Sequence, residues 1–150
     1  MKKYELTSET KVINGVKLHR IKALNSFRNI YEGDLGGWIE SEKNLSQDGN
    51  AWVEGNATVS GNAWVEGNAT VSGNAVVSGK EDYIVFKNWW SSGRYFTWTR
   101  SNNKWKVGCF YGSGEELIAK AYKDSEKSGR EYERVVKYVE SILKEENNNK

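Results

Sequence analysis

Basic and aromatic residues are interleaved between Lys87 and Lys106, a stretch with five Lys or Arg residues and no Asp or Glu. Trp and Tyr can stack on nucleotide rings while Lys and Arg bind phosphate, so a nucleotide or nucleic acid ligand is one hypothesis. No phosphate-loop or RNP-type motif accompanies the stretch. The candidates for binding a partner or a nucleotide are Lys87, Trp89, Arg94, Tyr95, Arg100, Lys104 and Lys106.

Histidine and cysteine are scarce in this sequence. The chain has one histidine, His19, and one cysteine, Cys109, so it can form neither an internal disulfide nor a Cys/His metal cluster. A histidine base needs a partner within hydrogen-bond reach, and the local sequence around His19 offers no plausible one. We therefore predict no catalytic residue, no metal and no cofactor.

Five near-identical hexads, GNAWVE, GNATVS, GNAWVE, GNATVS and GNAVVS, fill the chain between Gly49 and Gly79. A fixed six-residue period is typical of stacked repeats. Side chains alternate across a strand, so the Ala and Val of each hexad share an inward face, and Gly-Asn supplies the corner. The residues between them are predicted to face outward, and they are Trp52, Thr58, Trp64, Thr70 and Val76.

These hexads resemble the hexapeptide-repeat family. The resemblance implies a left-handed parallel β-helix with 18 residues per coil, and a homotrimer whose interface buries the five outward residues. The alternative for Trp52 and Trp64 is that the N-terminal hairpin or the C-terminal lobe of the same chain folds back over them. It also implies acyl transfer, for which the family uses a histidine on the repeat; residues 49–79 contain no His, Cys or Lys. We therefore keep acyltransferase activity as an alternative and predict that the protein is not an enzyme.

The flanking segments predict two further units. Asn14-Gly15 between apolar residues indicates a β-hairpin within residues 1–32 that covers one end of the β-helix of residues 33–80. Residues 81–150 read as a three-strand antiparallel meander followed by two helices with capping boxes at Ser113 and Ser128. The aromatic core of this α+β lobe is predicted to contain Phe86, Trp90, Phe96 and Trp98. The overall fold class is mainly β.

Charge and hydropathy indicate a protein of the cytoplasm with no membrane contact. The net charge of +2 is unevenly spread, with +5 in residues 1–30 and −5 in residues 31–80. No apolar run approaches the length of a membrane span, and the first residues lack the apolar region of a signal peptide.

The chain as a whole also resembles small accessory proteins of bacteriophages and prophages, most specifically in residues 33–79, from GDLGGWIESEKNLSQDGNAWV onward. This resemblance implies a noncatalytic, oligomeric binding protein in a bacterial host, such as an anti-CRISPR or other anti-defence inhibitor that blocks a host protein. Two alternatives remain beside acyl transfer. One is a sponge for a nucleotide or cyclic-nucleotide defence signal, and the other is a structural trimer module.

Overall fold

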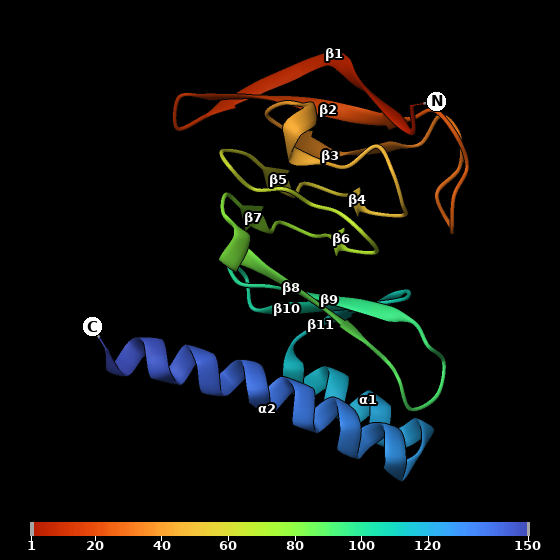
Figure 1. Ribbon diagram of the computed structural model, residues 1–150, viewed down its shortest axis with the longest axis vertical. Coiled ribbons are helices and arrows are strands. Elements are labelled where there is room, and N and C mark those ends of the chain that lie inside the picture. Colours follow the sequence, from red (N-terminus) through yellow and green to blue (C-terminus); the bar gives the residue numbers. More distant parts are fainter. Residues whose placement is uncertain (1, 150) are drawn as a thin grey trace.

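The computed structural model describes residues 2–149, which form three β-sheets and two α-helices. The elements lie in layers (Figure 1). An N-terminal hairpin forms one end, the hexads stack below it, a four-stranded sheet lies under the hexads, and the helices cover the far face of that sheet.

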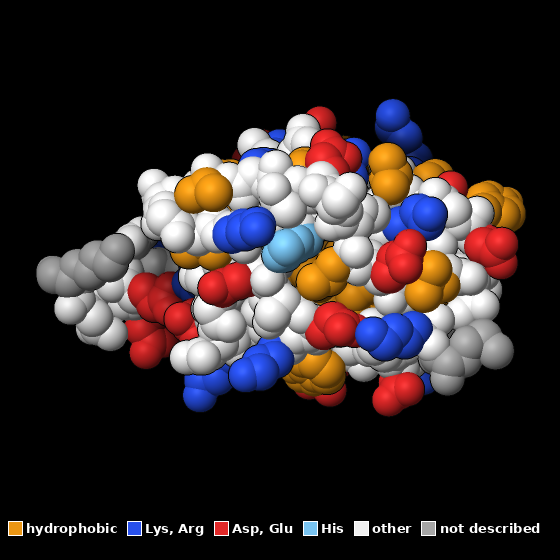
Figure 2. All heavy atoms as spheres, turned by 90° about the horizontal axis from the view of Figure 1, so that it is seen from above, with side chains coloured by type: hydrophobic (Ala, Val, Ile, Leu, Met, Phe, Trp, Pro, Cys, Tyr) orange, Lys and Arg blue, Asp and Glu red, His pale blue; other side chains and the backbone are white. Residues whose placement is uncertain are grey.

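The predicted hairpin is confirmed. β1 (Tyr4–Ile13) pairs antiparallel with β2 (Val16–Ala23), and the turn residues Asn14 and Gly15 have φ values of 51° and 81°. Figure 2 looks onto this end of the molecule, where basic and acidic side chains are interspersed. Arg20 pairs with Glu9 and Lys22 pairs with Glu5 across the two strands. The hairpin face therefore carries mixed charge rather than a basic patch.

The hexads and the segment that precedes them, from Leu35 onward, form short strands that lie over one another. We call residues 35–79 the repeat stack. Trp52 pairs with Thr70 and Thr58 pairs with Val76, each 18 residues apart, as predicted. Two sheets result, with strand orders β1-β2-β3-β5-β7 and β4-β6. The strands of the stack are β3 (Leu35–Ile39), β4 (Trp52–Val53), β5 (Thr58–Val59), β6 (Thr70–Val71) and β7 (Val76–Val77).

The predicted left-handed parallel β-helix is wrong as a fold class. Parallel pairing is partial, because the Gly-Asn corners leave two-residue strands, and the larger sheet also contains the antiparallel strands β1 and β2. On a further side of the stack, Leu45 and Val65 form an isolated bridge next to the 3-10 helix Glu42–Asn44. The described chain is instead a mainly β protein of mixed and antiparallel sheets.

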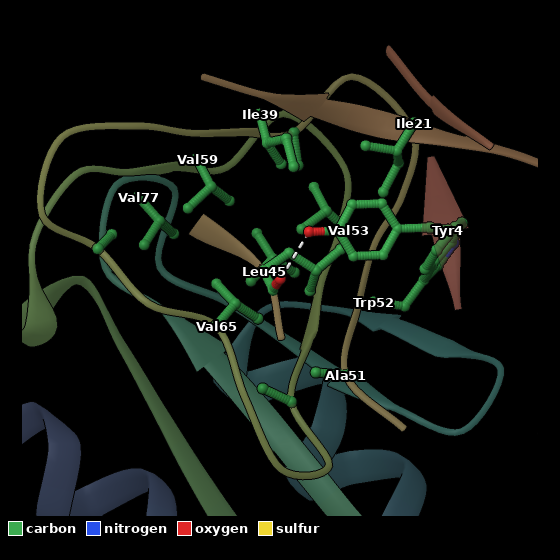
Figure 3. Packing of buried hydrophobic residues seen from close by; sticks show 14 of the residues in the cluster. Tyr4, Ile21, Ile39, Leu45, Ala51, Trp52, Val53, Val59, Val65 and Val77 are labelled. Atoms are coloured by element: carbon green, nitrogen blue, oxygen red, sulfur yellow. Dashed lines mark hydrogen bonds between the residues drawn. The ribbon is translucent and has the colours of Figure 1, made fainter. Parts of the chain in front are cut away.

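The interior of the stack is filled by the predicted Ala and Val residues of the hexads, which are all buried. The hairpin completes this core (Figure 3). Tyr4 extends its ring into the cluster, and its hydroxyl donates to the backbone oxygen of Leu45 at 2.6 Å. The expectation that the hairpin covers one end of the repeats is therefore confirmed.

Trp52 is not on the surface of the chain, so its expected place in a trimer interface gives way to the other expectation, that part of the same chain covers it. Its side chain is 1% exposed and belongs to the core. The segment of residues 24–34, which we call the cover loop, places the edge of Phe27 against it, with ring centroids 5.4 Å apart. Gly36 allows the close approach, since a β-carbon there would lie 2.7 Å from Trp52 Cζ2.

The other predicted outward residues divide into two groups. Thr58 and Thr70 are also buried within the chain, so they are not available to the predicted trimer interface. Trp64 and Val76 remain 42% and 51% exposed. The outward face of the repeat stack is therefore largely covered within the chain.

Residues 83–112 form a four-stranded antiparallel sheet in the order β11-β10-β9-β8, so the predicted three-strand meander is wrong by one strand. Gly108, with a φ of 57°, allows a turn inside the run KWKVGCFY and splits it into two strands. A 3-10 helix at Lys80–Asp82 leads into the sheet. Its strands are β8 (Tyr83–Lys87), β9 (Tyr95–Thr99), β10 (Lys104–Val107) and β11 (Phe110–Gly112).

Two helices pack on this sheet around the predicted aromatic core. α1 (Gly114–Asp124) starts at the predicted capping box of Ser113, whereas α2 (Glu126–Asn148) is capped by Ser125 and not by Ser128. Phe96 and Trp98 are buried in the core, with Phe86 and Trp90 packed against it. Within residues 2–149, neither helix has the length and apolar character needed to span a membrane.

Lys3 is an unusual member of the core layer. Its side chain is 6% exposed, and its Nζ donates to the backbone oxygen of Ala51 at 2.6 Å. The pKa of Lys3 is lowered from 10.5 to about 8. Burial is the main cause, the nearby charge of Arg28 acts in the same direction, and Asp48 opposes both. The ammonium form is therefore disfavoured in the folded protein.

The burial of Trp52 predicts a large difference in stability between substitutions of two tryptophans that occupy the same position in two identical hexads, Trp52 and Trp64. Trp52→Ala should lower the free energy of unfolding by about 3–5 kcal/mol, because it leaves a cavity under the cover loop. The matched variant Trp64→Ala should lower it by less than about 1 kcal/mol. Urea unfolding followed by circular dichroism measures both, and equal losses would contradict the assignment of Trp52 to the core.

The lowered pKa of Lys3 predicts a pH dependence of stability. Between pH 8 and 10 the unfolded chain keeps a proton that folded Lys3 has lost, so the unfolding free energy should rise with pH. Lys3→Met should remove this contribution, so the slope of stability against pH over that range should be smaller than in the wild type. Parallel slopes in the two proteins would show that the Lys3 pKa is not lowered.

Candidate functional site

The repeat stack and the C-terminal sheet meet at an edge of unpaired backbone groups. Two hydroxyl side chains of the sheet satisfy it: Thr97 Oγ1 accepts from the Thr70 backbone N–H at 3.0 Å, and Ser101 Oγ accepts from that of Val76 at 2.8 Å. Asn102 Nδ2 also donates to Asn74 Oδ1 at 3.2 Å. These bonds fix β9 beneath β6, as Figure 1 shows.

A cleft of about 390 Å³ lies at this junction. Three parts of the chain line it: the cover loop, the repeat stack and the C-terminal sheet. Its charged residues are three cations and one carboxylate, so its excess charge is positive. The lining residues are Arg28, Asn29, Glu54, Thr70, Arg94, Tyr95, Thr97, Lys106, Gly108 and Cys109.

Arg28 enters the cleft from the cover loop. Its backbone has a φ of 48°, an uncommon value for a residue with a side chain, and such conformations cluster at functional sites. Its Nη1 donates to Thr70 Oγ1 at 3.0 Å. Burial lowers the pKa of Arg28, while the Glu54 carboxylate opposes that effect. The guanidinium is therefore fixed in a partly desolvated position.

Lys106 and Glu54 form an ion pair in the lining of the cleft. Lys106 Nζ lies 3.4 Å from Glu54 Oε1, which also accepts from Ser72 Oγ at 2.7 Å. Both partners are partly buried. The Lys106 ammonium is thus held near the cleft by a carboxylate that can neutralise only one of the three cations.

Arg94 is the least committed of the cations. Its backbone N–H donates to Ser92 Oγ, but its guanidinium has no hydrogen-bond or ion-pair partner among residues 2–149. The guanidinium lies against the backbone of Gly108, where a β-carbon would collide with Nη1. Arg94 therefore presents free N–H donors at the rim of the cleft.

The structure brings together three of the seven residues predicted to bind a partner or a nucleotide: Arg94, Tyr95 and Lys106. Lys87 lies over the Tyr95 ring, with Nζ 5.7 Å from its centroid, outside the cleft lining. Trp89 is exposed and contacts Trp90. Their role in binding stays a prediction.

Arg100 and Lys104 also lie outside the cleft lining. The Arg100 guanidinium pairs with Glu146, donates from Nε to the backbone oxygen of Glu81, and lies over the Trp98 ring. These contacts occupy Arg100 in linking the sheet to α2.

Sequence reasoning missed Arg28 and Glu54. Arg28 follows the hairpin by several residues, and Glu54 looks like a corner residue of a repeat. Neither lies near Arg94 in the sequence, and only the tertiary fold brings the three together. One sequence pattern could have pointed to Glu54. The last position of every hexad is a polar residue, either Glu or Ser.

His19 and Cys109 do not form a reacting pair. His19 lies in β2 on the hairpin and does not line the cleft, whereas Cys109 is exposed at the β10–β11 turn and does line it. Among residues 2–149, no three His, Cys, Asp or Glu side chains are arranged to hold a metal ion.

The predicted trimer interface now depends on fewer residues. Trp64 and Val76 are exposed on the repeat stack, whereas Trp52, Thr58 and Thr70 are covered within the chain. A homotrimer stays a prediction, and of the five predicted interface residues only Trp64 and Val76 remain exposed for it.

Comparison with known proteins gives a partial similarity. No protein-family model matches the chain. Over 61 aligned residues, the chain is 34% identical to the uncharacterized acetyltransferase YdcK of Escherichia coli (strain K12). The similarity covers 35% of this chain and 19% of that protein, so the chain spans a small part of its relative.

This similarity has two consequences. It gives some support to the resemblance between the hexads and the hexapeptide-repeat family. It also contradicts the prediction that the chain is not an enzyme, because the similar protein is named as an acetyltransferase. The absence of a histidine from the repeats was therefore an insufficient reason to exclude catalysis.

Proposed function

We propose that this protein binds a phosphate-bearing small molecule, such as a nucleotide, in the cleft between the repeat stack and the C-terminal sheet. The observation that carries the proposal is the convergence of Arg28, Arg94 and Lys106 on one cavity that contains a single carboxylate. Guanidinium groups suit phosphate because their planar N–H donors match two phosphate oxygens.

The arrangement of the cations supports binding with little reorganisation. Thr70 positions Arg28, and Glu54 positions Lys106, before any ligand arrives. Side chains that are already ordered lose less conformational entropy on binding. Arg94, which has free donors, supplies the adaptable contact at the rim. Tyr95 adds an aromatic surface beside these charges.

A nucleotide ligand agrees with one of the functions expected from the sequence, the capture of a nucleotide defence signal in the cytoplasm of a bacterial host. The resemblance of residues 33–79 to phage accessory proteins supports that setting. The alternative, blockage of a host protein by the basic aromatic surface, predicts a protein partner rather than a small molecule.

Acetyl transfer is a second candidate function, favoured by the similarity to an acetyltransferase. Acetyl-coenzyme A carries phosphates that the same cleft could bind. In this reaction the nitrogen of an acceptor amine attacks the thioester carbonyl carbon and forms an amide bond while the carbon–sulfur bond breaks. The proton lost by the amine goes to the thiolate, which leaves as free coenzyme A thiol.

Phosphate binding predicts a defined set of mutational effects. Arg94→Ala and Arg28→Ala should each weaken pyrophosphate binding by about 10- to 100-fold, because each removes a charge-assisted contact of roughly 1.5–3 kcal/mol. Isothermal titration calorimetry at two salt concentrations measures the affinities. Binding should also weaken as salt increases.

Lys104→Ala is the matched control, because it removes one positive charge of the same sheet outside the cleft lining. Its effect on affinity should be less than about threefold. If wild-type protein does not bind pyrophosphate, or if Lys104→Ala weakens binding as much as Arg94→Ala, the cleft is not the phosphate site.

Acetyl transfer predicts release of free coenzyme A from acetyl-coenzyme A in the presence of an amine acceptor. A thiol-reactive dye measures the release. The rate should fall at least tenfold in Arg94→Ala if the cleft binds the donor. A rate equal to the uncatalysed background with a broad panel of amines would remove this candidate.

A further inference from the structure

A second cavity, of about 250 Å³, lies on the other face of the C-terminal sheet, between the sheet and the two helices. Its wall is partly apolar, with Val107, Phe110, Leu117 and Ala121 among the lining residues. Apolar walls with a few placed polar groups are typical of sites for small organic molecules. The charged cleft and this cavity therefore differ in chemistry.

The second cavity is also lined by Tyr132, a buried residue whose hydroxyl can donate a hydrogen bond. Asn88 is 4% exposed, and its Nδ2 donates to the Tyr132 hydroxyl at 3.3 Å. The Tyr132 hydroxyl has no acceptor for its own proton among residues 2–149. Buried donors are normally paired, so this proton is available to an acceptor on a molecule in the cavity. Burial also raises the pKa of Tyr132, which keeps the hydroxyl protonated.

The two cavities meet at the end of the sheet. Arg94 and Cys109 line both of them. Arg94 precedes β9, and Cys109 lies in the turn between β10 and β11, so together they form the rim that separates the two faces. A ligand that crosses this rim would place one end among the cations and the other beside Leu117 and Tyr132.

We infer that the ligand has two chemically different parts: a phosphate group held by the charged cleft and an uncharged heterocycle, such as a nucleoside base, held by the second cavity. This inference rests on the proposed phosphate binding in the cleft. Arg94 bridges the two parts, with its guanidinium at the phosphate and its stem along the rim. The Tyr132 hydroxyl donates to a carbonyl oxygen or ring nitrogen of the heterocycle.

Titration calorimetry with pyrophosphate and with ADP, GDP, CDP and UDP tests the inference. At least one nucleoside diphosphate should bind about tenfold or more tightly than pyrophosphate, because the heterocycle adds contacts. If pyrophosphate binds and every nucleoside diphosphate binds equally, the second cavity is not used and the inference is wrong, while the proposed function survives. If pyrophosphate itself does not bind, the proposed phosphate site, and with it the proposed function, is wrong.

Two variants of α1 locate the heterocycle. Ala121→Leu fills part of the second cavity and should weaken binding of the preferred diphosphate by about tenfold without changing pyrophosphate binding. Ala119→Leu adds the same side chain on the exposed side of the helix, outside the cavity, and should change neither. Equal affinities of the two variants for the nucleotide would overturn the inference.

Amide NMR of the wild-type protein gives an answer even if Ala121→Leu does not fold. The preferred diphosphate should shift the amide signals of Leu117, Ala121 and Ser128, in addition to those of Arg28 and Lys106. Pyrophosphate should shift only the amide signals of Arg28 and Lys106. Shifts confined to the cleft with both ligands would show that the heterocycle does not enter the second cavity.

Discussion

The unpaired backbone edge of the repeat stack is the constraint on which the arrangement of this protein depends. Short parallel strands expose N–H and C=O groups at both ends of a stack, and such groups need partners when they are buried. At one end, β2 pairs with β3 and supplies a backbone ladder. At the other end, the hydroxyls of Thr97 and Ser101 accept from Thr70 and Val76.

The candidate site follows from the second of these solutions. Because side-chain hydroxyls and not a continuous strand join the sheet to the stack, the two surfaces separate beside Thr97 and leave a cleft. The cover loop reaches this point because it must also protect Trp52 from water. Arg28 is carried into the cleft by that loop. One packing requirement thus places a cation of the site, and the docking of the sheet places the other two.

Local sequence patterns predicted most of the helices and strands, but they did not predict the contacts between segments that are distant in the sequence. The hexad period predicted the inward Ala and Val residues and the 18-residue pairing, and Asn14-Gly15 predicted the hairpin turn. The alternation of side chains along a strand also predicted that Trp52 faces away from the Ala and Val residues of its hexad. Alternation cannot show that a distant loop covers Trp52 on that side. The cleft was missed for the same reason, since Arg28, Glu54 and Arg94 come from three separate segments. The β-helix prediction failed because it extended the repeat pattern to strands that are too short and are bordered by antiparallel neighbours.

A crystal structure of the protein grown with pyrophosphate would show whether the anion binds in the cleft, because it locates the anion itself rather than its effect on affinity. A phosphate group is expected within hydrogen-bond distance of the Arg28 and Arg94 guanidinium groups and near Lys106, with the Thr97–Thr70 bond intact. Phosphate bound elsewhere with this cleft empty, or a C-terminal sheet that does not contact the repeat stack, would contradict it.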